Sequence, residues 1–279
     1  MTNQGQQQAG SSGQGASHPS ETWQSGAAYE PYVGRWSRLV AREFLPWLGV
    51  AEGGQWLDVG CGTGALTQTI LAVAAPRAVR GIDASAGFLE YARAQTPDPR
   101  ASFAVADARA TGEPEGAYDA AVAGLMLNFV PEPERAAAEM ARAVRVGGRV
   151  GVYVWDYAGE MQLMRHFWDA AVALEPADEA LDEGPRFPLC HPDALERLFR
   201  EVGLREVETR AIDIPTHFRD FDDCWTPFLG GQGAAPHYAM SLDAERREAL
   251  REALRARLPI APDGSIALMA RAWAARGTR

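Results

Sequence analysis

The sequence contains no lysine, so the 27 basic residues other than histidine are all arginines. Aspartate and glutamate number 37, which gives a net charge of −10 at pH 7. Proteins that bind the phosphate backbone of nucleic acids need clustered positive charge, and no run of arginines supplies it here. We therefore expect no nucleic acid as a partner.

Cysteine is scarce, and long apolar runs are missing. Cys61, Cys190 and Cys224 are too widely separated for a disulfide framework or a paired metal site, so we expect no metal. No apolar segment approaches the ~20 residues that cross a bilayer, and the N-terminus lacks the apolar core of a signal peptide. These absences predict a cytoplasmic protein that does not enter a membrane. Its 279 residues, 47% of them hydrophobic, are enough for one large core, or for one core with an inserted cap.

The most informative stretch is 55–67 (QWLDVGCGTGALT). It predicts a short buried strand, a tight turn and the start of a helix. Gly60, Gly62 and Gly64 allow the sharp turn and place no Cβ in the path of a ligand, which can then lie against the helix N-terminus. Gly60, Gly62 and Ala65 also satisfy the looser dinucleotide spacing, so these residues alone leave NAD open as the ligand.

Acidic residues end the next two strand-like segments. Asp83 ends 78–83 (AVRGID), at the distance expected of a carboxylate that accepts hydrogen bonds from ribose hydroxyls, and Asp107 ends 102–107 (SFAVAD). Asp58, the GCGTG loop, these two acids and the later Gly147-Gly148 turn occur in an order that resembles class I S-adenosylmethionine-dependent methyltransferases, in particular the small-molecule group known as type 11. The resemblance is close over 29–155 and looser beyond.

The resemblance implies an α/β fold: a Rossmann-like, doubly wound sheet of seven strands, mostly parallel with the last strand antiparallel, plus a helical cap. It implies S-adenosylmethionine as the cofactor and S-adenosylhomocysteine as the product. In this family an N-terminal helix commonly closes over the cofactor, so Tyr32 is expected to cover its methionine end and Arg38 to pair with its carboxylate. The expected cofactor-binding residues are Tyr32, Arg38, Asp58, Gly60, Cys61, Gly62, Asp83, Ala84, Phe88, Asp107, Ala108 and Leu125.

The loop expected beneath the reacting methyl group is 124–131 (GLMLNFVP). Methyltransferases that act on exocyclic or amide nitrogens often carry Asn/Asp-Pro-Pro-Tyr at this point, and this chain does not. Its mostly apolar loop favours a small or hydrophobic acceptor, and Asn128 is the one polar side chain.

We divide the chain into four parts. Residues 1–28, rich in Gln, Gly, Ser and Ala, are expected to be a disordered tail. The cofactor-binding core spans 29–155 and a helical cap spans 156–190. The last part, 191–279, is expected to complete the sheet with strands at 204–214 and 264–275, and to carry a substrate-facing lid at 215–258.

These features predict an enzyme that transfers a methyl group to oxygen, nitrogen or carbon of a small, apolar or aromatic metabolite. A base is needed only if the acceptor must first lose a proton. The candidates are His217, Asp156 and His166, with His191 and Tyr157 behind them, and none lies in a recognisable motif. An RNA or protein methyltransferase, and a protein of this fold that binds the cofactor without methyl transfer (a cyclase or a binding module), stay open. A homodimer is also compatible with the sequence.

Overall fold

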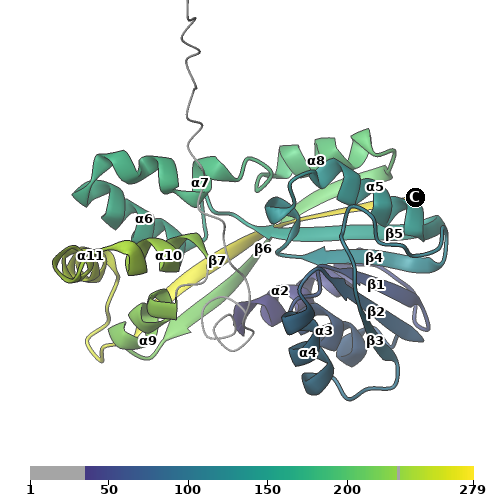
Figure 1. Ribbon diagram of the computed structural model, residues 1–279, viewed down its shortest axis with the longest axis horizontal. Helices are drawn as coiled ribbons and strands as arrows, with labels where there is room; N and C mark the ends of the chain where they lie inside the picture. Colours follow the sequence, from purple (N-terminus) through teal and green to yellow (C-terminus); the bar gives the residue numbers. More distant parts are fainter. Residues whose placement is uncertain (1–34, 231–232) are drawn as a thin grey trace, which may run out of the picture.

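The computed structural model describes residues 35–230 and 233–279. Its strands are β1 (Gln55–Val59), β2 (Ala78–Asp83), β3 (Ala101–Val105), β4 (Tyr118–Gly124), β5 (Val144–Trp155), β6 (Arg205–Phe218) and β7 (Ile266–Thr278). They form one sheet in the order β3-β2-β1-β4-β5-β7-β6 (Figure 1). The first five pair in parallel, and β7 is antiparallel to both of its neighbours. The predicted fold class is confirmed, whereas the predicted tail, 1–28, lies outside the described residues.

The sheet is built outward from its middle. β1 pairs with β2 on one side and with β4 on the other. The chain therefore reverses its direction of travel across the sheet after β3, when it returns to the centre to form β4. At such a reversal the loops that follow β1 and β4 leave toward opposite sides, and a crevice opens at the carboxyl ends of the strands. The glycine loop follows β1 at this crevice.

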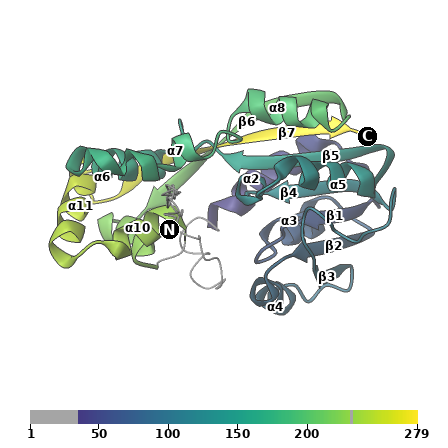
Figure 2. The same cartoon turned by 45° about the horizontal axis from the view of Figure 1, so that its top comes forward.

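Helices cover both faces of the sheet (Figures 1 and 2). One face carries α2 (Arg35–Leu48), α3 (Ala65–Val73) and α4 (Ala86–Gln95), and the other carries α5 (Pro133–Ala143) and α8 (Pro192–Glu201). The packing is close. A Cβ on Gly151 of β5 would lie 2.6 Å from Leu48 and 2.7 Å from Phe44, both on α2. Helix α2 is thereby held against the middle of the sheet, with its N-terminal end near the crevice.

A second lobe, the cap, lies beyond the end of the core (Figure 1). β6 and β7, of 14 and 13 residues, run from the core into it. Its helices are α6 (Gln162–Leu174), η3 (Pro176–Leu181), α7 (Glu183–Arg186), α9 (Phe221–Trp225), η4 (Thr226–Gly230), α10 (Ala234–Ser241) and α11 (Ala244–Arg257). Helix α6 lies beside α11 in both views, and the two helices are in contact (Figure 2).

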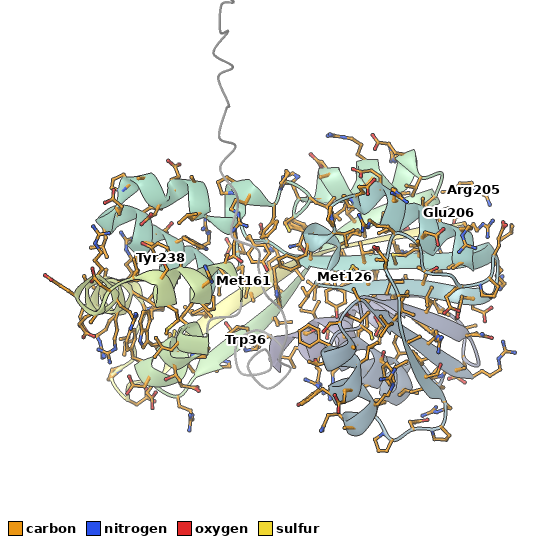
Figure 3. All side chains as sticks on the ribbon, in the orientation of Figure 1. Trp36, Met126, Met161, Arg205, Glu206 and Tyr238 are labelled. Atoms are coloured by element: carbon orange, nitrogen blue, oxygen red, sulfur yellow. The ribbon has the colours of Figure 1, made fainter. Side chains whose placement is uncertain are left out.

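Aromatic side chains fill the interior of the cap. Phe167 of α6 stacks on Phe228 of η4 with ring centroids 4.5 Å apart. Trp168 lies against Tyr238 of α10, which Figure 3 places within this lobe, and its indole N–H donates to Glu183 Oε2 at 2.9 Å. The segments expected as cap and lid, 156–190 and 215–258, thus pack on each other. The aromatic residues that we expected to face the substrate are largely occupied in this packing.

The element bounds differ from expectation mainly in the last two strands. β6 continues to Phe218, four residues past the expected end, so the start of the expected lid is strand. β7 likewise runs to Thr278 rather than 275. None of the described helices is long and apolar enough to cross a membrane.

Candidate active site

A cavity of about 460 Å³ opens at the carboxyl ends of β1 to β5. Two kinds of residue line it. The polar half lies over β1 to β3 and comprises Asp58, Gly60, Cys61, Gly62, Thr63, Asp83, Ala84, Ser85, Phe88, Asp107 and Ala108. The apolar half lies over β4 and β5 and comprises Met126, Phe129, Val130, Pro131, Trp155 and Tyr157. Leu125 lies between the halves.

The glycine loop bends over the polar half in a backbone conformation that favours glycine. Gly60, Gly62 and Gly64 have φ of +66°, +52° and +86°. A Cβ on Gly60 would lie 2.5 Å from Met126, whose place in the core Figure 3 shows, so this glycine permits close packing. A Cβ on Gly62 would meet nothing within 4 Å, and Gly62 lines the cavity. Gly62 therefore leaves space for a ligand at the loop.

Asp83 ties the glycine loop to the end of β2. Its Oδ2 accepts a hydrogen bond from the Gly62 N–H at 2.9 Å, and its Oδ1 accepts one from the Ser85 N–H at 2.8 Å. Burial raises the pKa of this carboxyl, although the two backbone bonds oppose the rise. A carboxylate has about four lone-pair directions, so Asp83 retains capacity for the ribose hydroxyls expected of it.

Asp58 is buried below the loop with one oxygen satisfied. Thr67 Oγ1 donates to its Oδ2 at 2.6 Å, whereas Oδ1 is buried without a hydrogen-bond partner. Burial raises the pKa of Asp58 to about 7, and the nearby charge of Asp83 adds to the rise. A cationic ligand group beside Oδ1 would both satisfy this atom and favour the ionised carboxylate.

The outer end of the polar half is more exposed. The carboxylate of Asp107 is held by Arg109, with N–O distances from 2.6 Å, and this partner lowers its pKa to about 2. Arg109 also bonds Glu132 at 3.0 Å. An adenine amino group that donated to Asp107 would therefore share a carboxylate oxygen that already accepts a hydrogen bond from Arg109. Ala84, Phe88 and Ala108 also line this end.

Leu125, at the boundary between the halves, has an uncommon backbone conformation. Leu125 has φ of +59°, in the left-handed region that leucine seldom adopts. Its N–H donates to the Tyr153 carbonyl of β5 at 2.8 Å, which fixes the turn that follows β4. Strain of this kind clusters at functional sites. Leu125 was predicted to contact the cofactor, but no sequence pattern predicted its left-handed backbone conformation.

Three rings from distant segments meet at the apolar half. The Phe187 ring, just after α7, lies 5.1 Å from the ring of Phe129 in η2 (Leu127–Phe129) and 5.4 Å from that of Tyr157. The cap thus reaches the wall of the cavity through Phe187. No local pattern in the sequence distinguishes Phe187 from the other aromatic residues of the cap, so its place at the cavity wall could not be predicted.

The expected catalytic residues lie apart from the described cavity lining. Asp156 is buried and accepts hydrogen bonds from the N–H groups of Gly159 and Glu160, both at 3.0 Å. His166 is half-buried on α6, where burial lowers its pKa, and His217 is exposed on β6. Tyr157, the lower-ranked candidate, is the one that lines the cavity.

Two further expectations concern α2. Arg38 donates to Gln68 Oε1 of α3 at 3.1 Å and does not line the cavity, whereas Ser37 beside it does. Tyr32 lies outside the described residues. The remaining expected cofactor residues, from Asp58 to Leu125, all line the cavity.

Comparison with known proteins agrees with this architecture. A family model described as a methyltransferase domain matches residues 57–152. Phosphatidylethanolamine N-methyltransferase of Cereibacter sphaeroides is 34% identical over 164 residues, which are 57% of this chain and 73% of the relative. A ubiquinone biosynthesis O-methyltransferase of Cupriavidus pinatubonensis is 31% identical over 177 residues, 60% of this chain and 68% of the relative.

A solved structure extends the likeness to the fold. Phosphoethanolamine N-methyltransferase 2 of Haemonchus contortus, in complex with S-adenosyl-L-methionine, superposes with a TM-score of 0.56 at 15% identity. The match covers 90% of this chain and 56% of that one, and it concerns the fold alone. The family match favours S-adenosylmethionine over NAD, which the glycine spacing had left open. The chain belongs to the class I S-adenosylmethionine-dependent methyltransferases.

Proposed function

We propose that this enzyme transfers a methyl group from S-adenosylmethionine to a small, largely apolar molecule bound in the apolar half of the cavity. The observation that carries the proposal is the division of one cavity into two chemically different halves. The polar half offers carboxylates and open backbone, whereas the apolar half offers aromatic and aliphatic side chains. Methyl donor and acceptor would meet at Leu125.

The polar half fits the cofactor in three respects. Gly62 leaves open space beside the loop. Asp83 accepts two backbone hydrogen bonds and keeps lone pairs for ribose hydroxyls, and Asp58 Oδ1 is a buried acceptor without a partner that suits the ammonium group of the methionine part. S-adenosylmethionine, when bound, supplies a methyl group that is already activated by a sulfonium charge.

The chain's own contribution would be to position the acceptor and exclude water. Met126, Phe129 and Tyr157 form an apolar wall close to Leu125. Holding two reactants in a productive geometry is worth on the order of 7–11 kcal/mol in favourable cases. We expect this term to dominate, because no described histidine lines the cavity as a base.

The lining also bears on the class of acceptor. Arg109 is the one basic side chain in the described lining, and Asp107 and Glu132 already pair with it. An anionic acceptor would thus find no free cation there. One of the two relatives is named for N-methylation of phosphatidylethanolamine and the other for O-methylation in ubiquinone biosynthesis. A homodimer and a cytoplasmic location stay predictions.

The proposal is tested in two stages. Calorimetry with S-adenosylmethionine and S-adenosylhomocysteine should give micromolar binding of both. A homocysteine-release screen over phenols, quinols, amines and carboxylic acids should then identify acceptors among the apolar compounds. Methylation of RNA or protein in the same assay, with no small acceptor, would contradict the proposal.

A further inference from the structure

Met126 joins the two halves of the cavity. It lines the apolar half, yet its side chain lies along the backbone of the glycine loop. A Cβ built on Gly60 would lie 2.5 Å from Cε of Met126, 2.6 Å from its Cγ and 3.1 Å from its Cβ. Figure 3 places Met126 at the end of the core that faces the cap. One side chain of the acceptor half therefore packs directly on the loop where the methyl donor is expected to bind.

Backbone hydrogen bonds fix Met126 from both sides. The N–H of Leu125 donates to the Tyr153 carbonyl at 2.8 Å, and the carbonyl of Met126 accepts from the Phe129 N–H at 2.9 Å. The left-handed backbone of Leu125 turns the chain at this point, and Met126 follows directly. The backbone thus sets the direction of the Met126 side chain, whereas its unbranched thioether chain can adjust to what lies against it.

The Met126 side chain is also accessible. It is only partly buried, whereas Leu125 and Leu127 on either side of it are buried. Because Met126 lines the cavity and packs on Gly60, it occupies space between the apolar half and the glycine loop. A molecule in the apolar half that approaches the loop has to pass this side chain.

We propose that Met126 is a specificity-determining residue that limits the bulk an acceptor carries beside its reacting atom. This inference rests on the proposed function and narrows its substrate class. The reacting atom has to reach the methyl donor at the glycine loop, and Met126 occupies the space next to that path. The rings of Phe129 and Tyr157 line the same half and suit a flat aromatic molecule. The acceptor class is therefore aromatic molecules that are unsubstituted on both sides of the reacting atom.

The chain contains a matched control. Met269 on β7 is also partly buried, but it is not in the described lining of the cavity. It pairs with Pro215 of β6. Replacing either methionine with alanine removes the same side-chain atoms, and only Met126→Ala opens space beside Gly60. Met126→Leu keeps apolar bulk at that place.

The test compares 4-propylphenol with 2,6-dimethyl-4-propylphenol, which carries an added methyl group on each side of the hydroxyl. Calorimetry measures the binding of each compound to the full chain saturated with S-adenosylhomocysteine. Wild-type protein, Met269→Ala and Met126→Leu should bind the dimethyl compound about fivefold more weakly, because a packed site resists added methyl groups. Met126→Ala should bind it about fivefold more tightly, because the added methyl groups then bury further apolar surface.

A second measurement needs no truncated side chain at the site. In wild-type protein labelled with methyl-¹³C methionine, the methyl signals of Met126 and Met269 are assigned from Met126→Leu and Met269→Ala. We expect S-adenosylhomocysteine to move the Met126 signal and 4-propylphenol to move it again. The Met269 signal should stay in place throughout.

Four outcomes would overturn the inference: wild-type protein that binds the dimethyl compound as tightly as the other phenol, a wild-type preference that survives in Met126→Ala, a Met126 signal that 4-propylphenol does not move, or no binding of either phenol by the saturated protein. Failure of the proposed function is a separate result, seen before any phenol is added. It is wild-type protein that binds neither S-adenosylmethionine nor S-adenosylhomocysteine, and the inference would fall with it.

Discussion

The two halves of the cavity are built by different means. The polar half comes from backbone turns and from carboxylates at the ends of adjacent strands, within residues 58–108. The apolar half is assembled from side chains of β5, of the β4–α5 connection and, behind them, of the cap. One half is therefore set by the backbone of a short segment, and the other by the packing of segments that lie far apart in the sequence.

The largest effect is expected from a substitution that fills the open space in the polar half. Gly62→Val should abolish binding of S-adenosylhomocysteine, because its side chain would occupy the open region beside the loop. Gly112→Val is a matched control, because Gly112 also has a positive φ and open space around it but does not line the cavity. Both variants should lose about 1–2 kcal/mol of unfolding free energy from backbone strain. Calorimetry showing normal affinity in folded Gly62→Val would refute the loop assignment.

The second prediction concerns Asp58 and pH. Its pKa is about 7 in the folded apo-protein and near 3.8 in the unfolded chain, so between these values the folded state holds the extra proton. Its contribution to stability is therefore lost as pH rises from 5 to 8, by roughly 3 kcal/mol. Asp58→Asn should not show this loss, and its cofactor affinity should be weaker at pH 8. Urea unfolding at the two pH values measures the difference, and parallel changes in both proteins would contradict it.

The third prediction separates a ligand carboxylate from a structural one. Asp83→Asn should weaken binding of S-adenosylhomocysteine by about 1.5–3 kcal/mol, because hydrogen bonds to a charged group are lost. Asp119 is its counterpart at the other end of the sheet, where Oδ2 accepts from the Gln55 N–H at 2.7 Å. Asp119→Asn should leave affinity unchanged. Equal affinities in all three proteins would remove Asp83 from the site.

The smallest effect belongs to the apolar half. Phe187→Leu keeps apolar bulk but loses ring contacts to Phe129 and Tyr157, each worth about 0.5–1.5 kcal/mol. We expect KM for the acceptor identified by the screen to rise about fivefold while affinity for S-adenosylhomocysteine stays constant. Phe221→Leu, a change inside the cap at a ring stacked on Trp225, is the control and should leave KM unchanged. A rise in cofactor Kd with Phe187→Leu would show that the halves are not independent.

Sequence predicted the polar half better than the apolar half, for a physical reason. Gly60, Gly62 and Asp83 lie in short segments whose spacing encodes a strand, a turn and a helix. The apolar half depends on which distant segments meet, and no local pattern in 125–131 indicates that Phe187 will pack there. That contact arises only in the tertiary fold.

The basic and acidic candidates illustrate the same limit. β6 extends through Phe218, and because side chains alternate along a strand, Thr216 and Phe218 face inward while His217 faces solvent. Asp156 was expected at the right end of β5, but two backbone N–H groups of the following turn occupy its oxygens. Arg38 lies on the expected helix, and Gln68 engages its guanidinium. In each case local geometry, which the sequence does not encode in a short pattern, decides what the side chain contacts.

After a bulge between Arg205 and Glu208, the ladder between β6 and β7 is continuous from Glu208 paired with Arg276 to Phe218 paired with Ile266. The same two strands therefore serve as the edge of the core sheet and as the stem of the cap. The cap is therefore not separable from the core, because the two share these strands. Replacing the cap, and with it the Phe187 ring behind the cavity wall, would therefore also mean replacing β6 and β7, so that a change in the cap would reshape the edge of the core sheet.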